Sequence, residues 1–97
     1  MAQLVNVERA KARLFPVTLD TTLSKAAQVR AKETVSYFSH TRPNGSTFSS
    51  AITEQGISFR GAGENIAYGQ KTPQEVMNGW MNSAGHRANI LNANFTK

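Results

Sequence analysis

The chain contains no cysteine, and it has only 6 acidic residues against 11 lysines and arginines among its 97 residues. Without cysteine there is neither a disulfide bond nor thiolate chemistry. Cytoplasmic proteins and many bacterial exported proteins share this lack, so it does not define the compartment. No stretch is apolar over the length of a membrane span, so we expect no transmembrane segment. The first ten residues lack the apolar region of a signal peptide, so an exported protein with this start would have lost its signal.

The shortage of acidic residues leaves a net charge of +5. A solvated helix surface is the simpler interpretation of this charge, and attraction to wall teichoic acid, nucleic acid or a lipid surface is the alternative. No basic run alternates with aromatic residues, so we expect no specific nucleic-acid partner. The cations concerned are spread along two expected helices: Arg9, Lys11, Arg13, Lys25, Arg30 and Lys32.

Apolar residues at helical spacing predict two helices in the first 39 residues. The first would run to about Phe15, because Pro16 follows it. Asp20 is the expected N-cap of the second, which would end near Ser39. The expected packing face of this second helix is a stripe of small and apolar residues: Leu23, Ala27, Ala31, Val35 and Phe38.

The middle of the chain alternates turn signals with short elements. Residues 40–46, HTRPNGS, have the composition of a turn, because Pro43 favours a turn start and Asn-Gly tolerates positive φ. A short helix is expected over Phe48–Gln55, with Gly56 as the residue that ends it. The segment Glu64–Tyr68 is predicted to be a strand.

Two capping signals organise the last third of the chain. Thr72 is a candidate N-cap, Pro73 suits the first helical position, and Glu75 completes a capping box. Ser83 is the candidate N-cap of a second helix, from Ala84 to Leu91.

His86 would then be the third residue of that last helix. The partial positive charge at a helix N-terminus disfavours imidazolium, so we expect a neutral ring that can bind a metal or accept a proton. An ordinary residue at a helix start is the alternative interpretation.

Three side chains are the candidates for chemistry: His40, Glu64 and His86. Two imidazoles and one carboxylate, with coordination positions left open, suit a zinc ion with a bound water. The intervals between them are long, and no local metal-binding spacing such as HExxH is present. Ser39 is a further candidate as a nucleophile, but neighbours in sequence rarely face each other productively, and there is no G-x-S-x-G turn.

Three stretches, YFSHTRPNGSTF, GAGENIAYG and NGWMNSAGHRANILN, together resemble the bacterial branch of the CAP superfamily. This superfamily comprises cysteine-rich secretory proteins, antigen 5 and pathogenesis-related proteins, and its bacterial members are called SCP-like extracellular proteins. The resemblance covers nearly the whole chain. It implies an α+β fold, an α-β-α sandwich with an antiparallel sheet between helices, and a location outside the cell or in the cell wall.

The resemblance also implies a site. His40 matches the family's first histidine, Glu64 the glutamate of its GEN motif, and His86 its second histidine. They would line a cleft in which some members bind zinc or another divalent cation. Eukaryotic members carry a further glutamate at the place of Ser83, so the four-residue set is incomplete here.

In the family, strands that follow the NANFT segment build most of the sheet. We therefore expect residues 1–97 to form a single CAP-like domain that is C-terminally incomplete and rich in helix. A single strand would leave unpaired edges, so we expect self-association through the incomplete sheet.

The expected function is a non-catalytic binding module for a lipid, peptide or cell-wall ligand, with a cleft that takes a divalent cation. One alternative is a metal-assisted hydrolase of peptide or cell-wall material, in which Glu64 is the base for a bound water. The other is a cationic protein that binds anionic polymers or lipids and loses this binding in salt.

Overall fold

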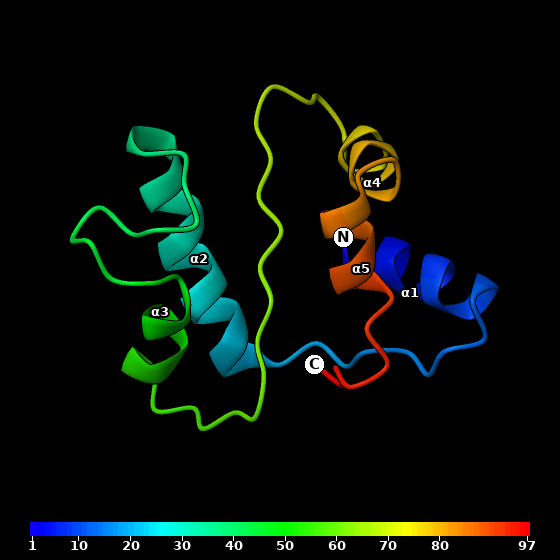
Figure 1. Cartoon of the computed structure of the whole chain (residues 1–97), viewed down its shortest axis with the longest axis horizontal. Coiled ribbons are helices and arrows are strands. Elements are labelled where there is room, and N and C mark those ends of the chain that lie inside the picture. Colours follow the sequence, from blue (N-terminus) through cyan, green and yellow to red (C-terminus); the bar gives the residue numbers. More distant parts are fainter. The chain divides into compact units, whose positions relative to one another are not determined.

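The computed structural model describes residues 1–97 and contains five α-helices (Figure 1). No helix combines the length and the apolar character that crossing a membrane requires. The helices are α1 (Ala2–Lys11), α2 (Thr21–Ser36), α3 (Ser49–Glu54), α4 (Pro73–Met81) and α5 (Ala84–Ile90).

The chain is divided into two compact units. Unit 1 consists of Met1–Thr18 and Ala67–Lys97 and contains α1, α4 and α5, which contact one another. Unit 2 consists of Leu19–Ile66 and contains α2 and α3, which also pack together. The expectation of one CAP-like domain over the whole chain stays a prediction.

No β-strand is present, and the prediction of a strand over Glu64–Tyr68 is wrong. The segment is neither helix nor strand, because alternating apolar residues do not form a strand unless a neighbouring segment pairs with their backbone. One isolated antiparallel bridge, between Thr41 and Thr47, is the β-type pairing that the structure contains. The chain is therefore rich in helix as expected, and the sandwich is not confirmed.

Helix α1 ends at Lys11, before the predicted end near Phe15. Arg13 takes a left-handed conformation with φ of 61°. Its N–H donates to the Ala10 carbonyl at 3.0 Å, and the next N–H, of Leu14, donates to the Arg9 carbonyl at 2.9 Å. This is a Schellman ending with arginine where glycine is usual, and it stops the helix before Pro16 can.

The start of α4 agrees with the sequence signals. Thr72 Oγ1 accepts from the Glu75 N–H at 3.2 Å, and Pro73 is the first helical residue. The second bond of the capping box has a different partner from the predicted one, because Glu75 Oε2 accepts from the Lys71 N–H at 3.0 Å. Glu75 therefore supports the chain just before the cap.

Helix α5 begins after Ser83 as predicted, and His86 is its third residue. Ser83 has the extended backbone of an N-cap, but its hydroxyl makes no capping hydrogen bond. The helix ends at Ile90, and Leu91 is its C-cap.

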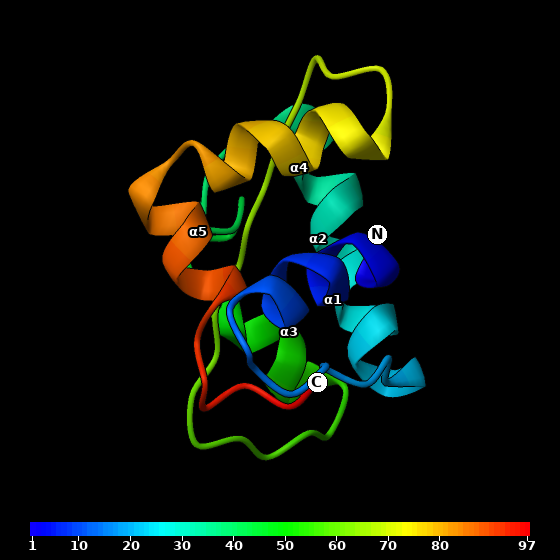
Figure 2. The same cartoon turned by 90° about the vertical axis from the view of Figure 1, so that its right-hand side faces the viewer.

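Arg9 lies at the centre of unit 1 and is only 2% exposed. The sequence placed it on a solvated helix face, and that interpretation is wrong. Its guanidinium binds the C-terminal end of α5 and the segment that follows it, where a positive charge complements the helix dipole. Figure 2 shows these C-terminal residues beside the segment after α1, and the Thr18 N–H donates to the Thr96 carbonyl at 2.8 Å. The carbonyls that accept from Arg9 are those of Phe15 (2.8 Å), Ile90 (2.8 Å), Asn92 (2.9 Å) and Phe95 (3.2 Å).

Helix α2 starts as predicted, with Asp20 Oδ1 accepting from the Leu23 N–H at 2.7 Å. It ends at Ser36 and not near Ser39. The predicted packing stripe is wrong, because Ala26 and Arg30 are the buried residues of α2, while Val35 is 89% exposed. A polar network described below takes the inner face of α2, which displaces the apolar stripe to the surface.

The loop between α2 and α3 contains the expected turn. The Gly45 N–H donates to the Arg42 carbonyl at 2.8 Å, and Gly45 has φ of 87°. Helix α3 lies within the predicted range, and Gly56, with φ of 80°, follows it as expected. Asn-Gly and the helix-ending glycine thus determine local structure here, because both positions need positive φ.

Candidate functional site

The structure brings together two of the three predicted site residues, His40 and Glu64, in unit 2. His40 lies in the loop after α2, and its Nδ1 is 2.8 Å from Glu64 Oε1. The two side chains differ in exposure, with His40 54% exposed and Glu64 11% exposed. A half-exposed imidazole is therefore backed by a nearly buried carboxylate.

Arg30, on the inner face of α2, holds the same carboxylate from the other side. Its Nε lies 2.8 Å from Glu64 Oε2, and its Nη2 lies 3.2 Å from Glu64 Oε1. Such a two-point contact fixes the plane of the carboxylate as well as its position. The hydrogen bond with Glu64 is the main reason that the pKa of Arg30 is raised, so the guanidinium stays charged.

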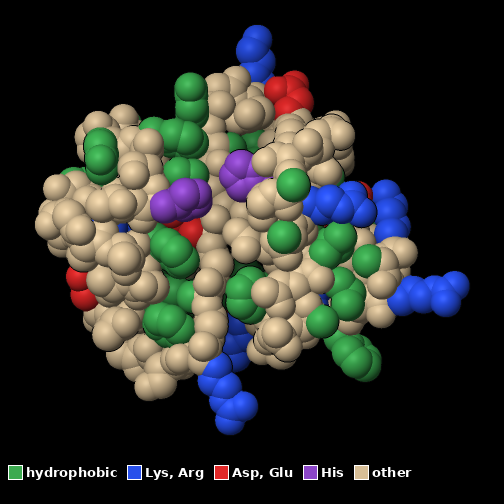
Figure 3. All heavy atoms as spheres, in the orientation of Figure 1, with side chains coloured by type: hydrophobic (Ala, Val, Ile, Leu, Met, Phe, Trp, Pro, Cys, Tyr) green, Lys and Arg blue, Asp and Glu red, His purple; other side chains and the backbone are tan.

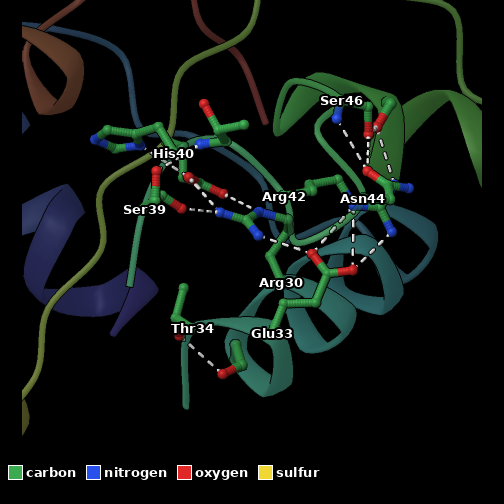
Figure 4. A network of polar contacts seen from close by, with 12 residues as sticks. Arg30, Glu33, Thr34, Ser39, His40, Arg42, Asn44 and Ser46 are labelled. Carbon is green, nitrogen blue, oxygen red and sulfur yellow. Dashed lines mark hydrogen bonds and ion pairs between the residues drawn. The ribbon is translucent and has the colours of Figure 1, made fainter. Parts of the chain in front are cut away.

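Glu33 links Arg30 to a second buried arginine, Arg42 (Figure 4). Glu33 Oε1 accepts from Arg30 Nη1 at 2.7 Å, and Glu33 Oε2 accepts from Arg42 Nη2 at 2.8 Å. Hydrogen bonds from Arg42 first, and then from Arg30, lower the pKa of Glu33 from 4.5 to about 2. Arg42 also binds Glu54 at 2.6 Å, and its own pKa is raised by Glu33 and then by Glu54.

The same two arginines hold the backbone on both sides of His40. Arg30 Nη2 donates to the Ser39 carbonyl at 2.6 Å. The Arg42 N–H donates to the Ser46 carbonyl at 2.8 Å, and its side-chain Nη1 donates to Ser50 Oγ at 2.9 Å. The loop that carries His40 is thus tied to α2 and α3 through buried cations, not through regular secondary structure.

Ser39 serves this loop as well. Its hydroxyl oxygen accepts from the Thr41 N–H at 3.0 Å, and it makes no hydrogen bond with His40. The serine next to the histidine therefore has a local turn-forming contact in the structure, in the manner common for serine in loops.

Two contacts set the orientation of the His40 ring, one with Glu64 and one with Phe48. A carboxylate only accepts hydrogen bonds, so the Nδ1 atom that faces Glu64 carries a hydrogen. A neutral His40 ring then has Nε2 as an acceptor. The ring also makes an edge contact with Phe48, with centroids 6.2 Å apart and planes at 64°.

His86, the third predicted residue, belongs to unit 1. It is half-buried on α5 and lies beside Trp80 of α4, with ring centroids 6.1 Å apart and planes at 36°. Figure 3 shows histidine side chains, coloured purple, at the surface of the molecule. Trp80 and His86 therefore form an aromatic pair at the junction of the last two helices.

Neither unit gathers three or more His, Asp or Glu side chains into a group that could hold a metal ion. The metal set His40, Glu64 and His86 stays a prediction.

Sequence reasoning missed Arg30 and Arg42, which it assigned to a solvated helix face and to a turn. One signal was available: Glu33 lies three residues after Arg30, which is the spacing of an ion pair on one helix face. That signal indicates a pair but not that the pair is buried.

Comparisons with known proteins agree with the motifs. The family model CAP, described as the Cysteine-rich secretory protein family, matches residues 2–97. The chain is 50% identical to Uncharacterized protein YkwD of Bacillus subtilis (strain 168), over 99% of this chain and 38% of that protein. It is 33% identical to Uncharacterized membrane protein YlbC of the same organism, over 96% of this chain and 28% of that protein.

The chain thus spans less than two fifths of the length of either relative. No solved structure matches it. Because the family match extends over nearly every residue, from 2 to 97, the chain belongs to the CAP family, the cysteine-rich secretory protein family.

Proposed function

We propose that this chain is a non-catalytic extracellular binding module, which holds a peptide, lipid or cell-wall ligand at His40. The observation that carries the proposal is the pairing of an exposed imidazole with a nearly buried, arginine-bound carboxylate. Such an arrangement presents one oriented ring nitrogen to a ligand. The location outside the cell rests on the family, whose description is secretory.

A divalent cation such as zinc is part of the proposal, with His40 as the residue that binds it and Glu64 behind the imidazole. A metal-bound imidazole characteristically donates its other ring N–H to a carboxylate, and His40 donates in this way to Glu64. Imidazole nitrogen also suits zinc as a ligand. When bound, the cation would polarise a ligand oxygen and so strengthen binding.

The contacts of Glu64 favour binding over hydrolysis. A general base must reach the proton of an attacking water, and both oxygens of Glu64 already accept from protein donors. The metal-assisted hydrolase is therefore the weaker alternative, although the same residues would serve it.

The buried arginines also weigh against a purely cationic interaction protein. Two of the six cations that the sequence assigned to solvated helix faces, Arg9 and Arg30, are buried and fully engaged with internal acceptors. Fewer charges are left to attract an anionic polymer. Self-association through the incomplete sheet stays a prediction.

Calorimetric titration with zinc tests the proposal. We expect weak binding to the unaltered chain and none to His40→Ala. Glu75→Gln is the matched control, because it removes a carboxylate that caps the chain before α4 and should leave the heat unchanged. Absence of heat with the unaltered chain, or equal heat with His40→Ala, would remove the cation from the proposal.

A second measurement separates binding from hydrolysis. The chain is incubated with peptide and peptidoglycan fragments, with and without a chelator. We expect no product in either case, whereas product that disappears with the chelator would establish the hydrolase.

A further inference from the structure

Arg30 is the centre of the polar network in unit 2, and nearly every donor of its guanidinium has a partner. Its Nε and Nη2 bind Glu64, its Nη1 binds Glu33, and its Nη2 also binds the Ser39 carbonyl. The side chain is only 6% exposed. A guanidinium held in this way cannot turn away from Glu64 without leaving buried donors unpaired.

Glu64 lies in a segment that is neither helix nor strand, so no regular element sets the direction of its side chain. The contact with Arg30 ties it to α2, across 34 positions of sequence. Because arginine offers two parallel N–H groups, it sets both oxygens of the carboxylate, and one of them then faces His40.

Because Arg30 is a donor, it determines which atoms of Glu64 and His40 accept hydrogen bonds and which donate them. Arginine is only a donor, so the group at position 64 must turn acceptor atoms toward it. The oxygen that faces His40, Glu64 Oε1, accepts from Arg30 Nη2 as well, so its contact with His40 at 2.8 Å requires a hydrogen on Nδ1. The ring nitrogen on the exposed side, Nε2, is then an acceptor.

We propose that Arg30 is a positioning residue of the binding site, which acts through Glu64 to hold His40 in the Nδ1–H tautomer with Nε2 presented as an acceptor. The inference rests on the proposed function for the identity of His40 as the ligand-binding group. It assigns Glu64 a place behind the imidazole. The ligand class that fits an imidazole acceptor is a cation or a hydrogen-bond donor.

The decisive variant is Glu64→Gln, which keeps the shape of the side chain. Glutamine has one acceptor oxygen and one NH₂ donor group. Arg30 Nε makes the shorter of the two contacts, 2.8 Å against 3.2 Å for Nη2, so we expect the amide oxygen to stay with Nε. The NH₂ group then faces His40, and Nδ1 accepts from it. We expect His40 to change to the Nε2–H tautomer, with a donor where the ligand needs an acceptor.

The tautomer is read from long-range ¹H–¹⁵N spectra of the whole, ¹⁵N-labelled chain, at a pH where the spectra report neutral rings. His86→Gln assigns the remaining ring signals to His40. The expected result is an Nδ1–H ring in the unaltered chain and an Nε2–H ring in Glu64→Gln. An Nδ1–H ring in both would overturn the proposal, and so would an Nε2–H ring in the unaltered chain.

Arg30→Lys tests the arginine itself, because an ammonium group cannot make the two-point contact. We expect His40 to lose its single tautomer and give signals of both. The matched control is Arg60→Lys, the same change at an exposed arginine of the same unit, which should leave the Nδ1–H ring intact. An unchanged ring in a folded Arg30→Lys overturns the proposal, and if this variant does not fold, Glu64→Gln decides.

Zinc alone is the probe for the link to binding. Loss of a residue that orients a metal-bound histidine typically lowers metal affinity by roughly 10–100-fold, and we expect this of Glu64→Gln and Arg30→Lys but not of Arg60→Lys. If zinc does not bind the unaltered chain, the cation of the proposed function fails while the tautomer result still decides the role of Arg30. If zinc binds all four proteins equally, the positioning role is overturned.

Discussion

Both units are organised around buried arginines, but the acceptors differ. In unit 1, Arg9 donates to backbone carbonyls alone. In unit 2, Arg30 and Arg42 donate mainly to carboxylates. Carbonyls do not titrate, whereas carboxylates lose their charge in acid. Arg9 therefore holds chain segments together independently of pH. Arg30 and Arg42 belong to a network that depends on ionised carboxylates, and this network carries the candidate site.

The largest effect should come from breaking the network of unit 2 at Arg42. Arg42→Met leaves Glu33 with one fewer cation and removes the pairing of Glu54. Arg42 is the buried member of these pairs and makes hydrogen bonds with both carboxylates, so we expect its loss to cost about 3 kcal/mol of unfolding free energy at neutral pH. Denaturant unfolding followed by circular dichroism measures it, with the exposed Lys25→Met as control. A loss as small as that of the control would show that the network of unit 2 contributes little to stability.

A smaller loss is expected from the corresponding change in unit 1. Arg9→Met leaves buried carbonyls without a donor, and those nearest the surface will regain water, so we expect about 2 kcal/mol. Trp80, the one tryptophan, belongs to unit 1 and reports its unfolding by fluorescence. Both measurements are then repeated in acid. The stability loss caused by Arg9→Met should persist there, whereas the loss caused by Arg42→Met should shrink. An equal decline of both losses would contradict the comparison.

Acid alone should weaken unit 2 selectively. The pKa of Glu33 is lowered from 4.5 to about 2 in the folded chain by its bonds with Arg42 and Arg30. The unfolded state therefore binds more protons between these values, and the stability that Glu33 contributes is complete above about pH 4.5 and is lost as the pH falls toward 2. Unfolding measured between pH 6 and pH 2 should show this slope, and Glu33→Gln should flatten it. A slope that Glu33→Gln leaves intact would assign the acid sensitivity to other carboxyls.

The smallest effect should be a gain, at the end of α1. Arg13 has φ of 61°, which favours glycine over a residue with a side chain. Arg13→Gly should relieve this strain and stabilise unit 1 by about 0.5 kcal/mol, net of the greater freedom of glycine in the unfolded chain. Thermal unfolding followed by Trp80 fluorescence is the measurement, with Lys11→Gly as the contrast, because glycine inside the helix should lower stability. Destabilisation by both changes would mean that the Arg13 side chain has a role of its own.

The candidate site was predictable in part. The motifs placed His40 and Glu64 in one site, and the structure joins them at 2.8 Å. Arg30 lies outside these motifs, and Arg42 lies inside the first of them, but nothing in their residue types indicates that either arginine is buried. The amphipathic pattern of α2 was misleading for the same reason, since it gave apolar residues the inner face that Arg30 occupies.

The sequence by itself determined the starts of α2 and α4 and the glycine that follows α3, through contacts that span only a few residues. Asp20 caps α2, Thr72 and Pro73 begin α4, and Gly56 follows α3, each for a reason of local geometry. Only the tertiary structure decided which face of α2 is buried and what holds the site. A buried guanidinium needs acceptors from segments far apart in sequence, and whether a strand forms depends on a neighbour that pairs with it. Neither condition is apparent from the spacing of nearby residues, so the burial of Arg30 and the absence of a strand at Glu64–Tyr68 emerge only when the chain is folded.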